Sequence, residues 1–136
     1  MAVTQDDISK RKATIAATPD LQQKASLMIG LGLDILYGGD IKNAQTLLYE
    51  AEKICETIDF QDGLGRIYLG KAAIAYFETD YSTSEKYGDQ AIEIFLKTGN
   101  QIDLAETYTN LGMGSWSQGD YSVALDYTFK GLQLYQ

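Results

Sequence analysis

Histidine is absent from the 136 residues, and cysteine, proline and tryptophan occur once each. Without histidine the chain lacks the commonest metal ligand and general base, which excludes most zinc sites and every His-dependent triad. The single cysteine, Cys55, cannot form an internal disulfide. No nucleophile or carboxylate is accompanied by a partner base, so we expect no metal, no cofactor and no enzyme activity.

Basic residues are also few, with 11 Lys and Arg against 19 Asp and Glu and a net charge of −8. This balance opposes the phosphate neutralisation on which nucleic-acid binding depends, so we expect no nucleic-acid partner. The one basic cluster is Lys10-Arg11-Lys12. We assign it to the solvated last turn of a first helix, where cations suit the helix dipole, with a membrane or partner contact as the alternative.

Long apolar runs are missing as well. No stretch of about 18 apolar residues could span a bilayer, and the first residues lack the apolar core of a secretory signal. We therefore expect a cytoplasmic protein that does not act at a membrane.

What is present is a 40-residue repeat. Scattered single glycines and 45% hydrophobic residues favour helices over strands. Three short motifs, whose aspartates are 40 residues apart, mark the period: Gly39-Asp40-Ile41, Thr79-Asp80-Tyr81 and Gly119-Asp120-Tyr121. The same offset aligns Gly32 with Ala72 and Gly112, small residues that let two helix backbones approach closely. Each period therefore predicts two antiparallel helices joined by a tight turn.

The turn residues specify how each hairpin closes. Gly39 and Gly119 can adopt the left-handed conformation that ends a helix, and the aspartate that follows can cap the next helix. Thr79 breaks this glycine pattern in the second repeat. At the start of the chain, Thr18 is expected to cap a helix whose first residue is Pro19. The pairs Gly30-Leu31-Gly32 and Gly112-Met113-Gly114 are interpreted as packing glycines, because no phosphate-loop spacing accompanies them.

Together these signals predict an all-α chain of about seven helices. We expect a capping helix at 4–17 within a first segment, 1–18, and three hairpin repeats at 19–58, 59–98 and 99–136. The sequence stops inside the expected last helix with no polar cap. We therefore expect the chain to be the N-terminal piece of a larger protein.

The third repeat carries a recognisable signature: Asn110-Leu111-Gly112, then Gly119-Asp120-Tyr121, Ala124-Leu125 and Gly131-Leu132. This pattern resembles the tetratricopeptide repeat, and the resemblance extends over nearly the whole chain. The usual period is about 34 residues, so this chain is more similar to the lengthened repeats of kinesin light chains, Leu-Gly-Asn-repeat scaffolds and many bacterial regulators. Ser84 and Gly88 depart from the pattern, which normally has Ala and a large residue there. The resemblance implies a right-handed α-solenoid of antiparallel hairpins.

The resemblance and the period also imply a concave groove lined by the first helix of each repeat. The candidate ligand-binding residues are Leu33, Tyr37, Arg66, Tyr76, Phe77, Glu106, Asn110, Met113 and Trp116. In the family an Asn at the place of Asn110 holds the backbone of an extended peptide. Trp116 is the strongest hot-spot candidate, with a place in the core as the alternative. Arg66 is the only groove cation, so a clamp for a chaperone's carboxylate is not expected.

These residues indicate a scaffold that binds a protein or peptide. Two alternatives stay open. The chain could be the regulatory arm of a larger bacterial signalling protein that carries a cyclase, kinase or transcription-regulator domain. It could also be a self-association module that forms a homodimer about a two-fold axis through the apolar residues of its last helix, Leu125, Phe129, Leu132, Leu134 and Tyr135.

Overall fold

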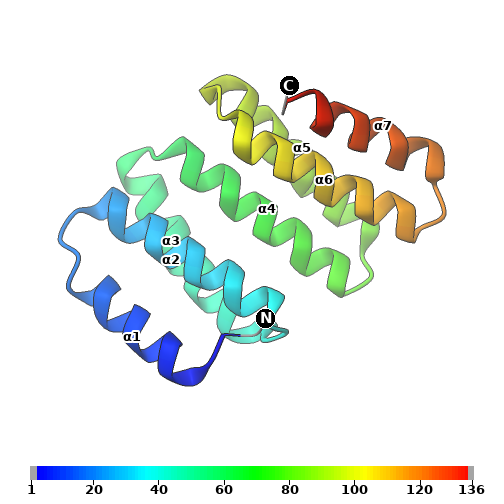
Figure 1. The fold of residues 1–136 in the computed structure, drawn as a ribbon. Coiled ribbons are helices and arrows are strands. Elements are labelled where there is room, and N and C mark those ends of the chain that lie inside the picture. The colour runs from blue at the N-terminus through cyan, green and yellow to red at the C-terminus, as the bar shows by residue number, and fades with distance from the viewer. Residues whose placement is uncertain (1–2, 135–136) are drawn as a thin grey trace. The chain divides into compact units, whose positions relative to one another are not determined.

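The computed structural model describes residues 3–134, which leaves Tyr135 outside the described part (Figure 1). The described residues form seven helices and no strand, which confirms the all-α prediction. The helices are α1 (Gln5–Ala16), α2 (Leu21–Tyr37), α3 (Ile41–Ile58), α4 (Gln61–Phe77), α5 (Tyr81–Thr98), α6 (Gln101–Ser117) and α7 (Tyr121–Gln133). The chain divides into two compact units, Met1–Gly70 and Lys71–Gln136, called here unit 1 and unit 2.

The helices reproduce the 40-residue period. The first helices of the three hairpins, α2, α4 and α6, begin at residues 21, 61 and 101, and the second helices, α3, α5 and α7, begin at residues 41, 81 and 121. Within unit 1, α2 packs against α1 and α3, and within unit 2, α6 packs against α5 and α7. Sequence neighbours are thus packing partners, as a helical repeat requires.

Aspartate caps the second helix of each hairpin. The side chains of Asp40, Asp80 and Asp120 accept hydrogen bonds from backbone amides three residues later, at 3.2, 3.2 and 3.3 Å. The residue before each aspartate has a positive φ, 99° at Gly39, 59° at Thr79 and 81° at Gly119. The predicted caps and left-handed glycines are confirmed. Thr79 adopts the same conformation without the freedom of glycine, which strains its backbone.

The predicted start of α2 is wrong. Asp20 caps the helix by accepting a hydrogen bond from the Gln23 amide at 3.1 Å, and the helix begins at Leu21. Pro19 lies before the cap. Thr18 belongs instead to the end of the preceding helix, because its hydroxyl donates to the Thr14 carbonyl at 2.7 Å.

The capping helix forms as predicted, with Thr4 as its N-cap, but the basic cluster is not in its last turn. Because α1 continues to Ala16, Lys10, Arg11 and Lys12 lie in its middle. Arg11 donates to the Asp34 carboxylate of α2 at 2.7 Å, so it ties the capping helix to the first hairpin. The cluster is therefore partly engaged within the protein.

In unit 1 a single leucine fills the space between two glycines. A Cβ added at Gly32 would lie 2.9 Å from Leu48 Cδ2, and one added at Gly70 would lie 3.0 Å from Leu48 Cδ1. Leu48 of α3 is buried between these backbones of α2 and α4. Gly30 differs, since its nearest neighbour would be Arg11 Nη2 at 3.7 Å. Only one glycine of the Gly30-Leu31-Gly32 pair is therefore a packing glycine.

In unit 2 the two residues that depart from the family pattern both have a structural role. Gly88 of α5 receives Leu111 of α6, whose Cδ2 would lie 2.5 Å from an added Cβ. Ser84 donates to the Ala72 carbonyl of α4 at 2.8 Å and so joins the two helices of its hairpin. The contact is therefore reversed relative to unit 1. There the leucine, Leu48, lies on the second helix of the hairpin and faces a glycine of the next helix, whereas here the glycine, Gly88, lies on the second helix and the leucine on the next.

Candidate binding surface

Five aromatic side chains gather in unit 2, where the first helix of a hairpin ends and the second begins. Called here the aromatic cluster, they are Tyr76 and Phe77 at the end of α4, Tyr81 at the start of α5, Trp116 at the end of α6 and Tyr121 at the start of α7. Their position follows from the tight turns. Asp80 and Asp120 are the N-caps of α5 and α7, so Tyr81 and Tyr121 are the first residues of these helices.

The cluster contains two ring pairs related by the 40-residue period. The rings of Tyr76 and Tyr81 are 5.6 Å apart, and those of Trp116 and Tyr121, at the equivalent positions, are 4.6 Å apart. Phe77 adds an edge-on contact with Tyr76 at 6.0 Å. Tilted and edge-on rings at these separations attract one another, so each turn presents a preassembled aromatic surface.

Tyr76 links the two ring pairs. Its hydroxyl is 2.6 Å from Ser117 Oγ, which neighbours Trp116 at the end of α6. Its ring lies over Gly114, where an added Cβ would be 3.7 Å from Tyr76 Cδ2. Ser117 in turn donates to the Met113 carbonyl at 3.1 Å. These contacts hold the Tyr76 ring against the last turn of α6.

Much of the cluster faces solvent. Phe77 is 48%, Trp116 59% and Tyr121 54% exposed, while Tyr76 and Tyr81 are half-buried. Met113, one helical turn before Trp116 on α6, is 63% exposed and extends the apolar surface. Because Trp, Tyr and Phe carry large apolar surfaces, their exposure leaves an accessible apolar patch at these turns.

The structure brings together four of the nine residues predicted for the groove, namely Tyr76, Phe77, Met113 and Trp116. Two more lie earlier on α6, where Glu106 is exposed and Asn110 is half-buried. The other three belong to unit 1: Leu33 is only 7% exposed, Tyr37 is exposed and Arg66 is half-buried. A single groove that joins all nine therefore stays a prediction.

Tyr81 and Tyr121 were not among the predicted site residues. In the sequence the two tyrosines mark the 40-residue repeat. The available signal was their spacing, since each follows an aromatic residue by five positions across the turn and the pattern recurs after 40 residues. Rings placed at the two sides of a tight turn are close enough to touch.

The charged residues next to the cluster in the sequence are all negative. Glu78, Asp80 and Asp120 are exposed and lie within two residues of its rings, and segments 76–82 and 113–122 contain no Lys or Arg. Asp80 and Asp120 use one carboxylate oxygen, Oδ1, for their helix caps, and a carboxylate can accept further hydrogen bonds. The aromatic surface therefore has an acidic border.

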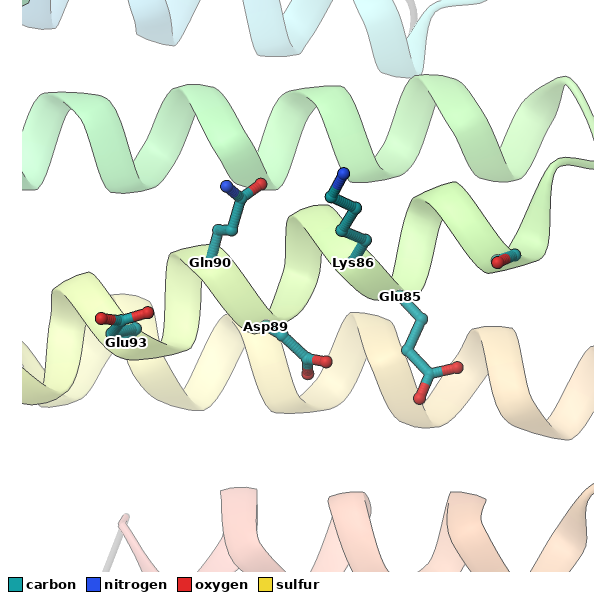
Figure 2. Close-up of a pocket in the computed structure, with 6 residues that line it drawn as sticks. Glu85, Lys86, Asp89, Gln90 and Glu93 are labelled. Atoms are coloured by element: carbon teal, nitrogen blue, oxygen red, sulfur yellow. The ribbon is translucent and has the colours of Figure 1, made fainter.

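A hollow with a volume of about 420 Å³ lies along α5 (Figure 2). Its lining residues all come from this one helix: Ser82, Glu85, Lys86, Asp89, Gln90 and Glu93. In Figure 2, Lys86 and Gln90 extend from one side of the helix, and Glu85 and Asp89 from the other. Charged side chains that diverge from a single helix do not enclose a ligand, so we take the aromatic cluster as the better candidate site.

Residues 3–134 contain no group of three or more Cys, Asp or Glu side chains arranged to hold a metal ion. None of their helices combines the length and the apolar character that a membrane span requires. Burial and the neighbouring Glu52 raise the pKa of the Cys55 thiol to about 11, which is the opposite of what a cysteine nucleophile needs.

Comparison with known proteins adds no relative. No family model, no curated protein and no solved structure matches the chain.

Proposed function

We propose that this chain is a protein-interaction scaffold that binds a peptide or protein segment at the aromatic cluster of unit 2. The observation that supports it is the exposure of Phe77, Trp116 and Tyr121, each about half accessible and each in contact with another ring of the cluster. Trp and Tyr are enriched among the residues that dominate binding energy, because they bury large areas at a small entropic cost.

Preorganisation supports the same proposal. The 2.6 Å contact between the Tyr76 hydroxyl and Ser117 Oγ restricts the Tyr76 ring before any ligand arrives. Trp116 is likewise held against Tyr121 at a ring separation of 4.6 Å. Side chains that are already ordered lose less conformational entropy on binding, which leaves more of the contact energy as affinity.

The repeat architecture is the second element of the proposal. Neighbouring hairpins with a 40-residue period are consistent with the right-handed solenoid of tetratricopeptide proteins, in which the first helices line a groove. In that arrangement Asn110 and Met113 would continue the binding surface along α6 from Trp116. Asn110 would then contact the backbone of an extended peptide through its amide.

Selection from a random displayed peptide library, followed by fluorescence anisotropy of the selected peptides, tests this function. We expect Trp116→Ala to weaken binding by about tenfold or more, the loss typical of an aromatic hot spot. Asn110→Ala tests the peptide-backbone contact separately. The chain's single tryptophan also makes its intrinsic fluorescence a direct reporter of this surface.

Tyr49→Ala is the matched control, because Tyr49 is an equally exposed aromatic residue on α3 of unit 1. It should leave the affinity unchanged. If the selected peptides bind the wild type, Trp116→Ala and Tyr49→Ala equally well, the aromatic cluster is not the binding surface.

Self-association is a second candidate, supported by an apolar stripe on α7. Tyr121, Leu125, Phe129 and Leu132 are each more than half exposed and follow one another at helical spacings of four, four and three. At the places of Leu125 and Phe129, the repeat-equivalent residues of α5 are Glu85 and Asp89. A face that is charged in one repeat is thus apolar in the next.

Light scattering at several protein concentrations tests this candidate. The double variant Leu125→Glu, Phe129→Asp gives α7 the residues of α5 and should abolish association, whereas Leu96→Glu, at an exposed apolar position of α5, should not. A wild-type chain that stays monomeric at every concentration would exclude the homodimer.

A further inference from the structure

We propose that the aromatic cluster selects a cationic segment, with arginine side chains stacked on its rings and paired with the carboxylates of Glu78, Asp80 and Asp120. The inference rests on the proposed function and specifies the chemistry of the bound segment. It follows from three features of unit 2: the exposed ring faces, the sign of the neighbouring charges and the absence of a basic residue in segments 76–82 and 113–122.

The exposed rings of the cluster can attract a cation. A cation within about 6 Å of a ring centroid is attracted by the electron-rich face, most strongly for Trp. This chain uses the interaction in its own fold, since Lys53 lies 4.4 Å from the Tyr49 centroid and Lys130 lies 5.9 Å from that of Tyr127. The cluster contains the only Trp of the chain, yet its sequence neighbourhood supplies no cation.

Three carboxylates stand next to the rings in the sequence and can pair with the same cation. Asp80 and Asp120 immediately precede Tyr81 and Tyr121, and Glu78 immediately follows Phe77. Because the helix caps hold both aspartates at the turns, their charges stay beside the ring pairs. A guanidinium that lies flat on a ring still directs its N–H groups outward in the ring plane, where a carboxylate at the border can accept them.

Arginine fits this surface better than lysine. Its planar guanidinium stacks on aromatic rings and donates to a carboxylate at the same time, whereas the ammonium of lysine is compact and strongly hydrated. An acidic segment is disfavoured, since it would place like charges beside Glu78, Asp80 and Asp120 and approach a chain with a net charge of −8.

Three fluorescein-labelled peptides that differ only in having Arg, Gln or Glu at alternate positions test the charge preference by anisotropy. We expect the Arg peptide to bind about tenfold more tightly than the Gln peptide, from one ring contact and one ion pair, and the Glu peptide not to bind. Binding of the Arg peptide should weaken as salt is added and should change the fluorescence of Trp116.

Two variants with the same change in net charge locate the binding site. Glu78→Gln, Asp80→Asn and Asp120→Asn together remove the acidic border, and Asn preserves both helix caps. Glu85→Gln, Asp89→Asn and Glu93→Gln remove three carboxylates that α5 carries beyond its first turn (Figure 2). We expect the first variant to reduce the preference for Arg over Gln to about threefold or less, and the second to leave it unchanged.

The outcomes separate this inference from the proposed function. Equal losses in the two triple variants would mean that the Arg peptide is held by general charge, and the inference would be wrong. If library-selected peptides need Trp116 but Arg, Gln and Glu peptides bind equally, the scaffold function stands and the charge preference fails. If no peptide binding depends on Trp116, both fail.

Discussion

Gly30 and Gly32 of α2 provide a stringent test of the packing, because they are two residues apart in one helix and have different surroundings. A Cβ at Gly32 would meet Leu48 Cδ2 at 2.9 Å and Cγ at 3.0 Å, whereas one at Gly30 would meet only Arg11 Nη2 at 3.7 Å. The two distances at Gly32 are so short that Leu48 would have to move, whereas the distance at Gly30 is an ordinary van der Waals contact. We expect Gly32→Ala and Gly30→Ala to change stability in opposite directions.

The magnitude follows from two terms. Replacing a helical Gly with Ala raises the free energy of unfolding by about 0.5–1 kcal/mol, because Ala has less conformational freedom than Gly in the unfolded chain. Both variants share this gain. Over-packing costs about 1–3 kcal/mol and applies only to Gly32→Ala. Gly30→Ala should therefore be more stable than the wild type, and more stable than Gly32→Ala by about 1–3 kcal/mol. Leu48 cannot relieve the clash by moving towards α4, because it already lies against Gly70.

Urea denaturation followed by circular dichroism at helical wavelengths measures both variants, provided that the dependence on urea is the same in each. Leu48→Val in the Gly32→Ala background is the matched test of the mechanism. Shortening the side chain that clashes should lower the cost of the alanine, which a double-mutant cycle detects as coupling between the two positions. Equal stabilities for Gly30→Ala and Gly32→Ala would refute the packing described for Leu48.

Two further predictions concern backbone strain and pH. Thr79→Gly should stabilise the chain by about 1 kcal/mol, because glycine adopts the 59° φ of this position without strain; an unchanged or lower thermal midpoint would contradict this. Burial and Glu52 raise the pKa of Cys55 from 9.0 to about 11, so the unfolded chain releases the thiol proton first and stability should fall as the pH rises from about 9 to 11. Burial and Asp89 also raise the pKa of Tyr127, so Cys55→Ala should make this fall shallower without abolishing it, as urea midpoints across that range would show.

Local structure was the most predictable part of this protein. The helix starts after Asp40, Asp80 and Asp120 follow from side chains that cap amides only three residues away. The one local error, at Thr18 and Pro19, arose because two residues could cap the same helix. Asp20 does so, while Thr18 bonds back to Thr14. Such competition is decided by small energy differences between neighbouring residues.

The candidate site was predictable in part. The period and the family resemblance predicted that Tyr76, Phe77, Met113 and Trp116 line a groove, and the structure places all four in unit 2. Tyr81 and Tyr121 were missed because their contacts cross a turn, and periodicity within one helix does not report such contacts. Leu33 was assigned to a groove, but it packs near Gly70 with 7% of its surface exposed.

The helices, their order, their 40-residue period and the chemistry of their turns can be predicted from the sequence, since these depend on residues a few positions apart. Which glycines are packing sites depends instead on contacts between helices. Gly32, Gly70 and Gly88 receive leucines from other helices, whereas Gly30 does not. Tertiary contacts also pair the aromatic rings across each turn and join Tyr76 to Ser117, beside Trp116. The physical reason is the same in both cases: packing depends on side chains from different helices, and no pattern along one helix specifies which of them meet.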